Sequence, residues 1–543
     1  LAVARLEQIV KDSGAGSVAV FGSARASLET LTMRHRCCRK LDWREPSCFV
    51  DPGLARKISR AIARLDDRLA TSLGEIQNAD FILVAGADPV REAPMLVLAM
   101  RQAVRKGAVV VVIDPRPVSL PFDFTHLPAT PGQIEARLAS LVSLALDPET
   151  IKKLDGSFLA FVDAMSAHLP ADPEMTEQIV MLAGKLKESH KPLLICGTGV
   201  VKETTPDFAA DLAVLLQSVQ GECGLFYLFP EANAYGAALL AGADQPSFSD
   251  TLQAIEEGTI KAVITVESDP FFQYPDRLRL EKAFAQLELV IALDYLPTAT
   301  TARAHILLPT ATHFETAAHF INQEGRIQFA QPVHSSARPL SQAGDGSHPP
   351  RLYDNDVVNN VGEGPQPAWQ IISKLMAAMT REVEASTLPE FPRIFAEEAD
   401  GLAPLRQHAY PVDGVRIVPE RRSAPVCLVT AGPGPEKDDI ESMELVLTTW
   451  TYGTEELSSF SEPVRQATPS PEITMHAEDA ARAGLGEGDT VKLHLDRGVL
   501  ELPLRLSTTM ARGIVVLPRH RQLDWQQLQA CQEGRLTCRI EKA

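Results

Sequence analysis

The sequence predicts an α/β protein with two related, doubly wound parallel-sheet halves, followed by a C-terminal domain that resembles a β-barrel. Two observations carry the α/β prediction: short apolar runs that end at acidic turns occur in pairs, and these pairs occur at two places in the chain. A third observation concerns residues 442–543, where short alternating runs between turn residues are typical of a small barrel. With 543 residues, the chain is long enough for several domains.

The first strand pair is predicted at Phe81–Pro89 and Val109–Arg116. Ala93–Lys106 lies between these runs and is predicted as a helix. Gly107 follows it and is suited to close the helix in a left-handed conformation. The segment is therefore predicted to form one βαβ unit.

A second unit of the same kind is predicted from Ala262–Pro270, a helix near Arg279–Gln286, and Leu287–Asp294. The spacing from Asp88 to Asp114 is nearly the same as the spacing from Asp269 to Asp294. Any two βαβ units have similar dimensions, but both copies also share an Asp-Pro turn after their first strand. This match favours two related nucleotide-binding halves.

A further strand, Pro192–Gly199, ends in a pair of glycines that would let backbone amides approach a phosphate. The third glycine of a dinucleotide fingerprint is absent, so an ordinary strand-to-helix turn fits equally well.

The predicted regions are a first α/β region at 1–230, a second at 231–402 with a flexible loop at 335–365, a linker at 403–441 and the barrel at 442–543.

The barrel prediction comes from three alternating runs, Leu445–Thr449, Asp489–Leu495 and Val499–Leu506. A short helix with a glycine cap, Ala477–Gly484, is predicted between the first and second.

Composition excludes several classes of function. The formal net charge of −18 opposes binding to a nucleic-acid backbone, and no apolar stretch is long enough to span a membrane. The eight cysteines are scattered and contain no CxxC pair, which favours a reduced cytoplasmic compartment and no four-cysteine cluster or zinc site in this chain. Because residue 1 is Leu and not Met, we expect preceding sequence.

The most distinctive segment is His313–Phe329. His313 and His319 flank Glu315 but are six residues apart, whereas the helical histidine pair of a zinc protease is four apart, so that class is disfavoured. The turn containing Asn322, Gly325, Arg326 and Gln328 is suited to tie a loop either to a ligand or to neighbouring backbone. No nucleophile elbow or phosphate-binding lysine loop supports a hydrolase or a kinase.

Together these motifs resemble the molybdopterin oxidoreductase family, which includes formate dehydrogenases and the large peripheral subunit of bacterial NADH-quinone oxidoreductase. The chain is most similar to this second kind of member. The resemblance covers nearly the whole chain. Its landmarks are the two Asp-Pro turns, Gly22–Glu29, Leu307–Thr310 with Glu315, Asn322–Arg326 and Ile473–Arg512.

The resemblance implies a fold like that of formate dehydrogenase and DMSO reductase, in which two molybdopterin guanine dinucleotides lie between the halves at strand-end loops. The corresponding positions here are Gly86, Asp88, Pro89, Asp114, Arg116, Gly197, Gly199, Asp269, Pro270, Asp294 and Thr298. The alternative is a set of strand-end turns without a nucleotide, because the NADH-quinone oxidoreductase member has this fold but has lost the cofactor. Arg116 is the one cation among several acidic residues, which disfavours two pyrophosphates. We therefore expect water, or side chains from 311–328, in place of cofactor.

Cys48 lies near the position of the family's metal ligand and is the candidate catalytic and metal-binding residue. In formate dehydrogenases a histidine follows that ligand, but here Phe49 follows it. The later segment Pro230–Gly236 lacks the family's substrate-binding arginine, and Glu231 would repel formate.

These departures imply a scaffold without its own metal, cofactor or catalytic residue. Iron–sulfur clusters are then expected in a preceding region, and the partners are expected to be other subunits of a membrane-associated oxidoreductase, cytoplasmic and peripheral to the inner membrane. The alternatives are a molybdenum or tungsten bis-pterin enzyme of the formate dehydrogenase type and a pure interaction module.

Overall fold

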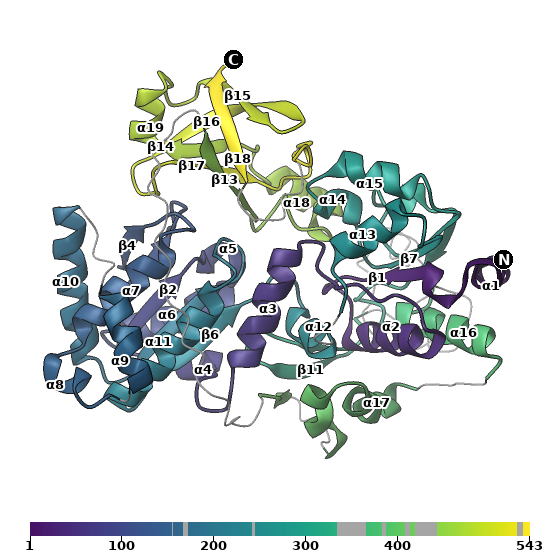
Figure 1. Ribbon diagram of the computed structural model, residues 1–543, viewed down its shortest axis with the longest axis horizontal. Helices are drawn as coiled ribbons and strands as arrows, with labels where there is room; N and C mark the ends of the chain where they lie inside the picture. Colours follow the sequence, from purple (N-terminus) through teal and green to yellow (C-terminus); the bar gives the residue numbers. More distant parts are fainter. Residues whose placement is uncertain are drawn as a thin grey trace, which may run out of the picture. The chain divides into compact units, whose positions relative to one another are not determined.

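The computed structural model describes residues 1–154, 156–166, 172–241, 245–333, 365–382, 387–407, 413–418, 442–528 and 536–543. They form two compact units, each with its own parallel sheet. Unit 1 comprises Leu1–Ala55 and Glu231–Ile417, and unit 2 comprises Arg56–Pro230 and Val418–Ala543. The predicted α/β class with parallel sheets and a C-terminal barrel is confirmed (Figure 1).

The division into units differs from the predicted contiguous region 1–230. Strand β1 (Val18–Phe21) pairs in parallel with β7 (Ala262–Val266), so the segment Leu1–Ala55 belongs with the later sheet. Such pairing joins residues far apart in sequence, and a run of four apolar residues does not reveal its partner. The predicted loop at 335–365 lies outside the described residues except for its last residue. Of the predicted linker, only 403–407 and 413–418 are described.

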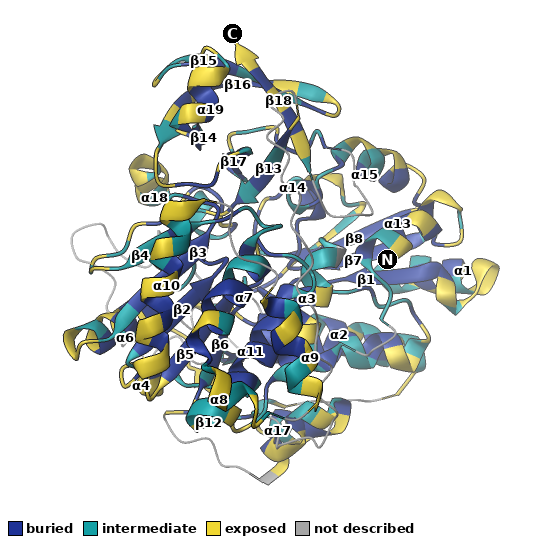
Figure 2. Ribbon diagram, turned by 60° about the vertical axis from the view of Figure 1, so that its left-hand side comes forward, coloured by how far each residue is buried: buried dark blue, intermediate teal, exposed yellow. Residues whose placement is uncertain are grey.

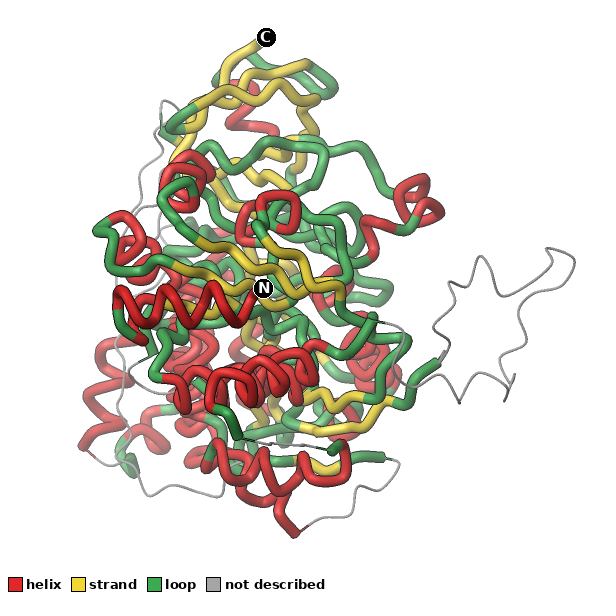
Figure 3. The backbone as a smooth tube through the Cα atoms, turned by 90° about the vertical axis from the view of Figure 1, so that its right-hand side faces the viewer, coloured by secondary structure: helices red, strands yellow, loops and turns green. Residues whose placement is uncertain are grey.

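The main sheet of unit 1 has the order β1-β7-β8-β9, and all its strands are parallel. Its remaining strands are β8 (Leu289–Asp294) and β9 (Ile306–Pro309). The three strands β1, β7 and β8 are buried (Figure 2). In Figure 3 the amino terminus is marked at the start of helix α1 (Ala2–Ser13). The helices of the unit are α1 (Ala2–Ser13), α2 (Leu28–Leu41), α12 (Ala234–Leu240), α13 (Phe248–Glu256), α14 (Pro270–Gln273), α15 (Arg277–Phe284), α16 (Ala368–Thr380) and α17 (Phe391–Glu398).

A second, antiparallel sheet of unit 1 contains β10 (Ala318–Ile321), β11 (Arg326–Ala330) and β12 (Val415–Arg416). The tight turn predicted here joins β10 to β11, and Asn322 Oδ1 accepts hydrogen bonds from the backbone of Glu324 and Arg326, at 3.1 and 3.0 Å. Asn233 Oδ1 accepts from the backbone N–H of Ile321 at 3.0 Å. The polar side chains therefore tie this hairpin to neighbouring backbone.

Unit 2 contains a parallel sheet of order β4-β3-β2-β5-β6. Its strands are β2 (Phe81–Ala85), β3 (Val109–Asp114), β4 (Thr125–Pro128), β5 (Pro192–Gly197) and β6 (Gly224–Leu228). Helices α7 and α11 contact the sheet, while α4 and α6 supply Ile76 and Met100 to an apolar core with strands β2 and β3. The helices are α4 (Leu73–Ile76), α5 (Pro89–Glu92), α6 (Pro94–Arg105), α7 (Ile134–Ala145), α8 (Pro148–Ile151), α9 (Gly156–Met165), α10 (Pro173–Glu188) and α11 (Thr205–Gln220), with α3 (Pro52–Arg64) beginning in unit 1.

The C-terminal part of unit 2 is a closed barrel of order β13-β17-β14-β16-β15-β18. Its apolar core includes Trp525, which is completely buried. The elements are β13 (Met443–Thr448), α18 (Glu462–Ala467), β14 (Ile473–His476), α19 (Ala477–Arg482), β15 (Thr490–Leu495), β16 (Gly498–Ser507), β17 (Ile514–Pro518) and β18 (Thr537–Lys542).

Candidate functional site

The two predicted βαβ copies are both present, as β2-α6-β3 in unit 2 and β7-α15-β8 in unit 1. Their first turns are closed by the same backbone hydrogen bond. Gly86 N–H donates to Ile113 O at 2.8 Å, and Glu267 N–H donates to Leu293 O at 2.8 Å. The acceptor in each copy immediately precedes the aspartate that ends the second strand. These bonds place Gly86 and Glu267 at equivalent positions.

In unit 2, Arg116 is surrounded by carboxylates. Its guanidinium donates to both oxygens of Asp114, at 2.9 and 2.8 Å, and contacts Glu92 Oε1 at 2.8 Å. Both Arg116 and Asp114 are buried. Burial favours the neutral form of Arg116, but the charges of Asp114 and Glu92 prevail and raise its pKa. The one cation of the predicted cofactor loops is therefore already neutralised by the protein.

The glycines of these loops have packing roles. A Cβ on Gly86, whose φ is +60°, would lie 2.1 Å from Val201 Cγ1, and a Cβ on Gly197 would lie 2.1 Å from the carbonyl oxygen of Gly86. Gly199 is exposed and has no such neighbour, while its carbonyl accepts a hydrogen bond from Lys57 Nζ at 3.0 Å.

Part of the same edge of the sheet is covered by the barrel. Val200 packs in one apolar cluster with Met510 and Ala511, and Ala511 N–H donates to Pro115 O at 2.9 Å. Asp88 caps helix α5 by accepting from Arg91 N–H at 3.4 Å, and Pro89 is the first residue of that helix.

The corresponding residues of unit 1 also have local partners. Asp269 Oδ1 accepts from Thr300 Oγ1 at 2.6 Å, and Pro270 begins α14. Thr298 Oγ1 accepts from the backbone of Thr301 at 3.1 Å. The structure therefore gives these predicted site residues roles in strand-end turns.

Asp294 of unit 1 forms a buried ion pair with Arg25, whose Nη2 lies 3.1 Å from Asp294 Oδ2. The partner comes from the loop after β1, which is distant in sequence. Arg25 also lies over the ring of Tyr295, 5.0 Å from its centroid, and that ring contacts His313 with a centroid distance of 5.5 Å.

Glu267 is a site residue that sequence reasoning missed. It is buried, its backbone φ is +48°, and its Oε2 has no hydrogen-bond partner. Burial raises its pKa to about 7, with Asp294 adding to the effect and Arg25 opposing it. When the two copies are aligned at their Asp-Pro turns, Glu267 stands opposite Gly86. This difference could have identified Glu267 from the sequence.

Cys48 is buried in unit 1, where Arg34 Nη2 donates to its sulfur at 3.0 Å. Arg34 also pairs with Glu45 at 2.9 Å. Burial raises the pKa of the Cys48 thiol to about 11, although Arg34 opposes the shift. These surroundings therefore favour the protonated thiol at neutral pH.

His313, Glu315 and His319 have three separate roles. His319 pairs with buried Glu29, Glu315 accepts from the backbone and hydroxyl of Thr312, and His313 lies between Tyr295 and Phe320. Across the described ranges, no group of three or more His, Cys, Asp or Glu side chains is arranged to hold a metal ion.

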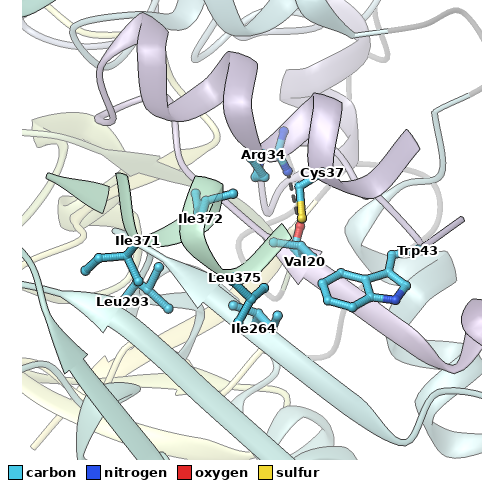
Figure 4. A pocket seen from close by; sticks show the side chains of 9 residues that line it. All are labelled: Val20, Arg34, Cys37, Trp43, Ile264, Leu293, Ile371, Ile372 and Leu375. Atoms are coloured by element: carbon cyan, nitrogen blue, oxygen red, sulfur yellow. Dashed lines mark hydrogen bonds between the residues drawn. The ribbon is translucent and has the colours of Figure 1, made fainter. Parts of the chain in front are cut away.

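Beside the unit 1 sheet lies an apolar cavity of about 10 Å³, roughly the space of one water probe (Figure 4). Arg34 Nη1 donates to Val20 O beside it, at 3.2 Å. A cavity of this size and character has no room for a cofactor. Its lining residues are Val20, Arg34, Cys37, Trp43, Ile264, Leu293, Ile371, Ile372 and Leu375.

The comparisons with known proteins decide the family. Residues 1–338 match the molybdopterin oxidoreductase family, and residues 446–536 match the Molydopterin dinucleotide binding domain. The chain belongs to the molybdopterin oxidoreductase family. Its fold is similar to that of acetylene hydratase from Pelobacter acetylenicus, with a TM-score of 0.61, 14% identity, and coverage of 100% of this chain and 88% of the other.

Among curated relatives, the G subunit of NADH-quinone oxidoreductase from Pseudomonas fluorescens is 24% identical, over 92% of this chain and 63% of the relative. The same subunit from Shewanella oneidensis is 26% identical, over 82% and 57%. The alpha subunit of NADPH-Fe(3+) oxidoreductase from Geobacter sulfurreducens is 23% identical, over 100% and 66%. The chain thus spans less than two thirds of the length of these relatives. No helix in the described part of the chain has the length and apolar character needed to cross a membrane.

Proposed function

We propose that this chain is the molybdopterin-oxidoreductase-like body of a large subunit of NADH-quinone oxidoreductase. In this proposal it supports the transfer of electrons from NADH through iron–sulfur clusters that lie outside the chain. It carries no pterin or metal of its own. It binds other subunits of a membrane-associated complex, on the cytoplasmic side and peripheral to the inner membrane.

The observation that carries the proposal is the ion pairing of Arg116. A pyrophosphate in a partly dry site needs cations or several hydrogen-bond donors. Asp114 and Glu92 already neutralise Arg116, and the barrel covers Val200 and Pro115 nearby. The residues present in unit 2 therefore do not fit a dinucleotide pyrophosphate. The two G-subunit relatives support the assignment to this subunit.

Metal analysis and ligand-dependent stability test the proposal. We expect no stoichiometric molybdenum or tungsten in the purified chain and no thermal stabilisation by extracted molybdopterin guanine dinucleotide. A tight ligand at a hundred times its dissociation constant would add about 2.7 kcal/mol, and a gain of that size would contradict the scaffold. Glu92→Gln is the matched variant. It removes one of the two carboxylates that pair with Arg116, so it should improve any residual binding of pyrophosphate.

The second candidate is a molybdenum or tungsten bis-pterin enzyme of the formate dehydrogenase type. The match of residues 446–536 to the dinucleotide-binding domain and the exposed Gly199 loop favour it. It would use Cys48 as the metal ligand and the strand-end loops as pterin sites. Formate oxidation coupled to a dye, and abolished by Cys48→Ser, would support this candidate. Absence of activity in a chain loaded with metal and pterin would reject it.

The electron acceptor is a separate question. The relative named for NADPH-Fe(3+) oxidoreductase suggests an iron(III)-reducing complex as another setting for the same scaffold. Purification from the native source, with the associated subunits identified and NADH or NADPH oxidation assayed with quinone and with iron(III), distinguishes the two. A stable complex without either activity would instead support a pure interaction module.

A further inference from the structure

Glu267 carries two energetic costs that its counterpart in unit 2 avoids. Its backbone lies in the left-handed region, with φ +48°, where a side chain is strained. Its carboxyl is buried with Oε2 unpartnered, which costs free energy because the lost hydration is not replaced. Gly86 also has a positive φ, +60°, but without strain or charge. Such costs concentrated at one residue point to a function.

The surroundings of Glu267 contain more acid than base. Its backbone carbonyl accepts a hydrogen bond from Ser23 Oγ at 2.5 Å, which fixes the residue against the loop after β1. Arg25 from that loop and Asp294 from the end of β8 are the charged groups acting on its carboxyl. The guanidinium of Arg25 thus acts on two buried carboxyl groups, those of Asp294 and Glu267.

We propose that Glu267 is a proton-exchange site that switches Arg25 between one carboxylate partner and two. When Glu267 is protonated, Arg25 balances Asp294 alone. When Glu267 releases its proton to water, Arg25 balances both carboxylates. No other bond forms or breaks. Because Arg25 belongs to the loop between β1 and α2, its change of partner alters the restraint on that loop.

The neighbouring groups place this exchange near neutrality. The pKa of Glu267 is raised to about 7, because burial raises it most, Arg25 lowers it, and Asp294 raises it as a like charge. The pKa of His313 is lowered to about 4 by burial and by Arg25, so this histidine stays neutral over the relevant range. Burial raises the pKa of Tyr295, so its phenol also stays neutral. The charge change therefore falls on the carboxyls; burial also raises the pKa of Asp294, although Arg25 and the backbone hydrogen bonds of Asp294 oppose that shift.

An infrared titration of the full chain tests the proposal. A protonated carboxyl has its own carbonyl stretching band, and we expect one such band to disappear as pH rises through neutrality. The band should be missing in Glu267→Gln and present in Glu257→Gln, an exposed control on the same unit. Glu267→Gly is the second variant, because it reproduces the residue found at the equivalent position of unit 2.

Two neighbouring substitutions separate a proton switch from a structural role. Asp294→Asn removes the like charge and should move the titration of Glu267 to lower pH. Arg25→Met removes the cation and should move it to higher pH. These opposite shifts would support the switch. A Glu267 band that titrates at the ordinary glutamate pKa of roughly 4.3, or a midpoint that neither substitution moves, would overturn it.

Discussion

The two βαβ copies share backbone geometry but differ in how charge is buried at their strand ends. In unit 2, Asp114 is paired by Arg116, which follows it closely in the chain. In unit 1, Asp294 is paired by Arg25 from a distant loop, and Glu267 adds a second carboxyl where unit 2 has Gly86. Both arrangements depend on tertiary contacts, since Glu92 of α5 also pairs with Arg116, but the second contains a carboxyl whose Oε2 lacks a partner and whose pKa is raised to about 7. The same turn therefore supports either a fixed ion pair or a site that responds to pH.

The largest expected effect is the difference in the stability lost when each of the two arginines is replaced. Arg116→Met leaves Asp114 and Glu92 buried without their cation and should cost about 3–5 kcal/mol of stability. Arg25→Met should cost less, because Glu267 can remain protonated and only Asp294 must lose its partner. Urea unfolding, with hydrogen exchange at β3 and β8, measures both losses. The exposed residue Arg105 provides the control substitution Arg105→Met. Equal losses at the two arginines would remove the distinction between the copies.

Substitutions at the two equivalent turn residues, Gly86 and Glu267, should change stability in opposite directions. Gly86→Ala places a Cβ 2.1 Å from Val201 Cγ1 at φ +60° and should cost about 1–3 kcal/mol. Glu267→Gly relieves strain and removes a buried carboxyl, so it should raise the melting temperature. Gly184→Ala, at an open position in α10, is the control for adding a methyl group.

The gain from Glu267→Gly should also depend on pH. Because the folded-state pKa of Glu267 is raised, its contribution to stability is fully present below the ordinary glutamate pKa of roughly 4.3. That contribution is lost as pH rises through the folded pKa of about 7. Thermal melts should therefore show a larger gain at about pH 8 than at about pH 5. A gain that is the same at both pH values would mean that Glu267 does not titrate in this window.

Each copy also has a half-buried histidine near its charged pair, and the two should titrate differently. Burial lowers the pKa of His126, but the neighbouring Asp114 opposes the shift. The pKa of His313 is lowered to about 4 by burial, and Arg25 acts in the same direction. Proton NMR of the imidazole rings, assigned with His126→Gln and His313→Gln, should show His126 titrating at higher pH.

The folded state favours the neutral form of His313, and this determines how its contribution to the free energy of unfolding changes with pH. Its contribution is present above the ordinary histidine pKa of roughly 6.5 and is lost as pH falls. His313→Gln should therefore make stability less sensitive to acid between this value and about 4. An unchanged pH profile would contradict the assignment.

The smallest expected effect concerns the Asp-Pro turns. In unit 1, Thr300 Oγ1 donates to Asp269 at 2.6 Å, so Thr300→Val should cost about 1 kcal/mol. Thr300→Ser keeps the hydroxyl and is the matched control. In unit 2, Asp88 caps its own helix, and Asp88→Asn should cost less because asparagine also caps well. A larger loss from Asp88→Asn in thermal melts would reverse this ranking of the two turns.

Several elements could be predicted from sequence because their signals are local. The strands at Phe81 and Val109, the helix between them and the positive φ of Gly107, +99°, all agree with the structure. The second copy and the alternating strands of the barrel agree as well. In each case apolar periodicity and turn chemistry lie within about 30 residues, as expected for a βαβ unit.

The candidate site could be predicted only in part. The Asp-Pro turns and the aspartates at the strand ends were found from their repeated pattern. Their partners were not, because Arg25 and Asp294 are far apart in the sequence and Glu92 meets Arg116 only after β2 and β3 are paired.

The sequence by itself therefore determined the fold class, the repeated units, the barrel and the resemblance to the family. Only the tertiary structure decided that β1 belongs with β7, that Arg116 is already neutralised, and that Glu267 occupies a buried, left-handed turn position. The physical reason is that strand formation depends on neighbouring residues, whereas the charge state of a buried carboxyl depends on burial and on side chains supplied by distant segments.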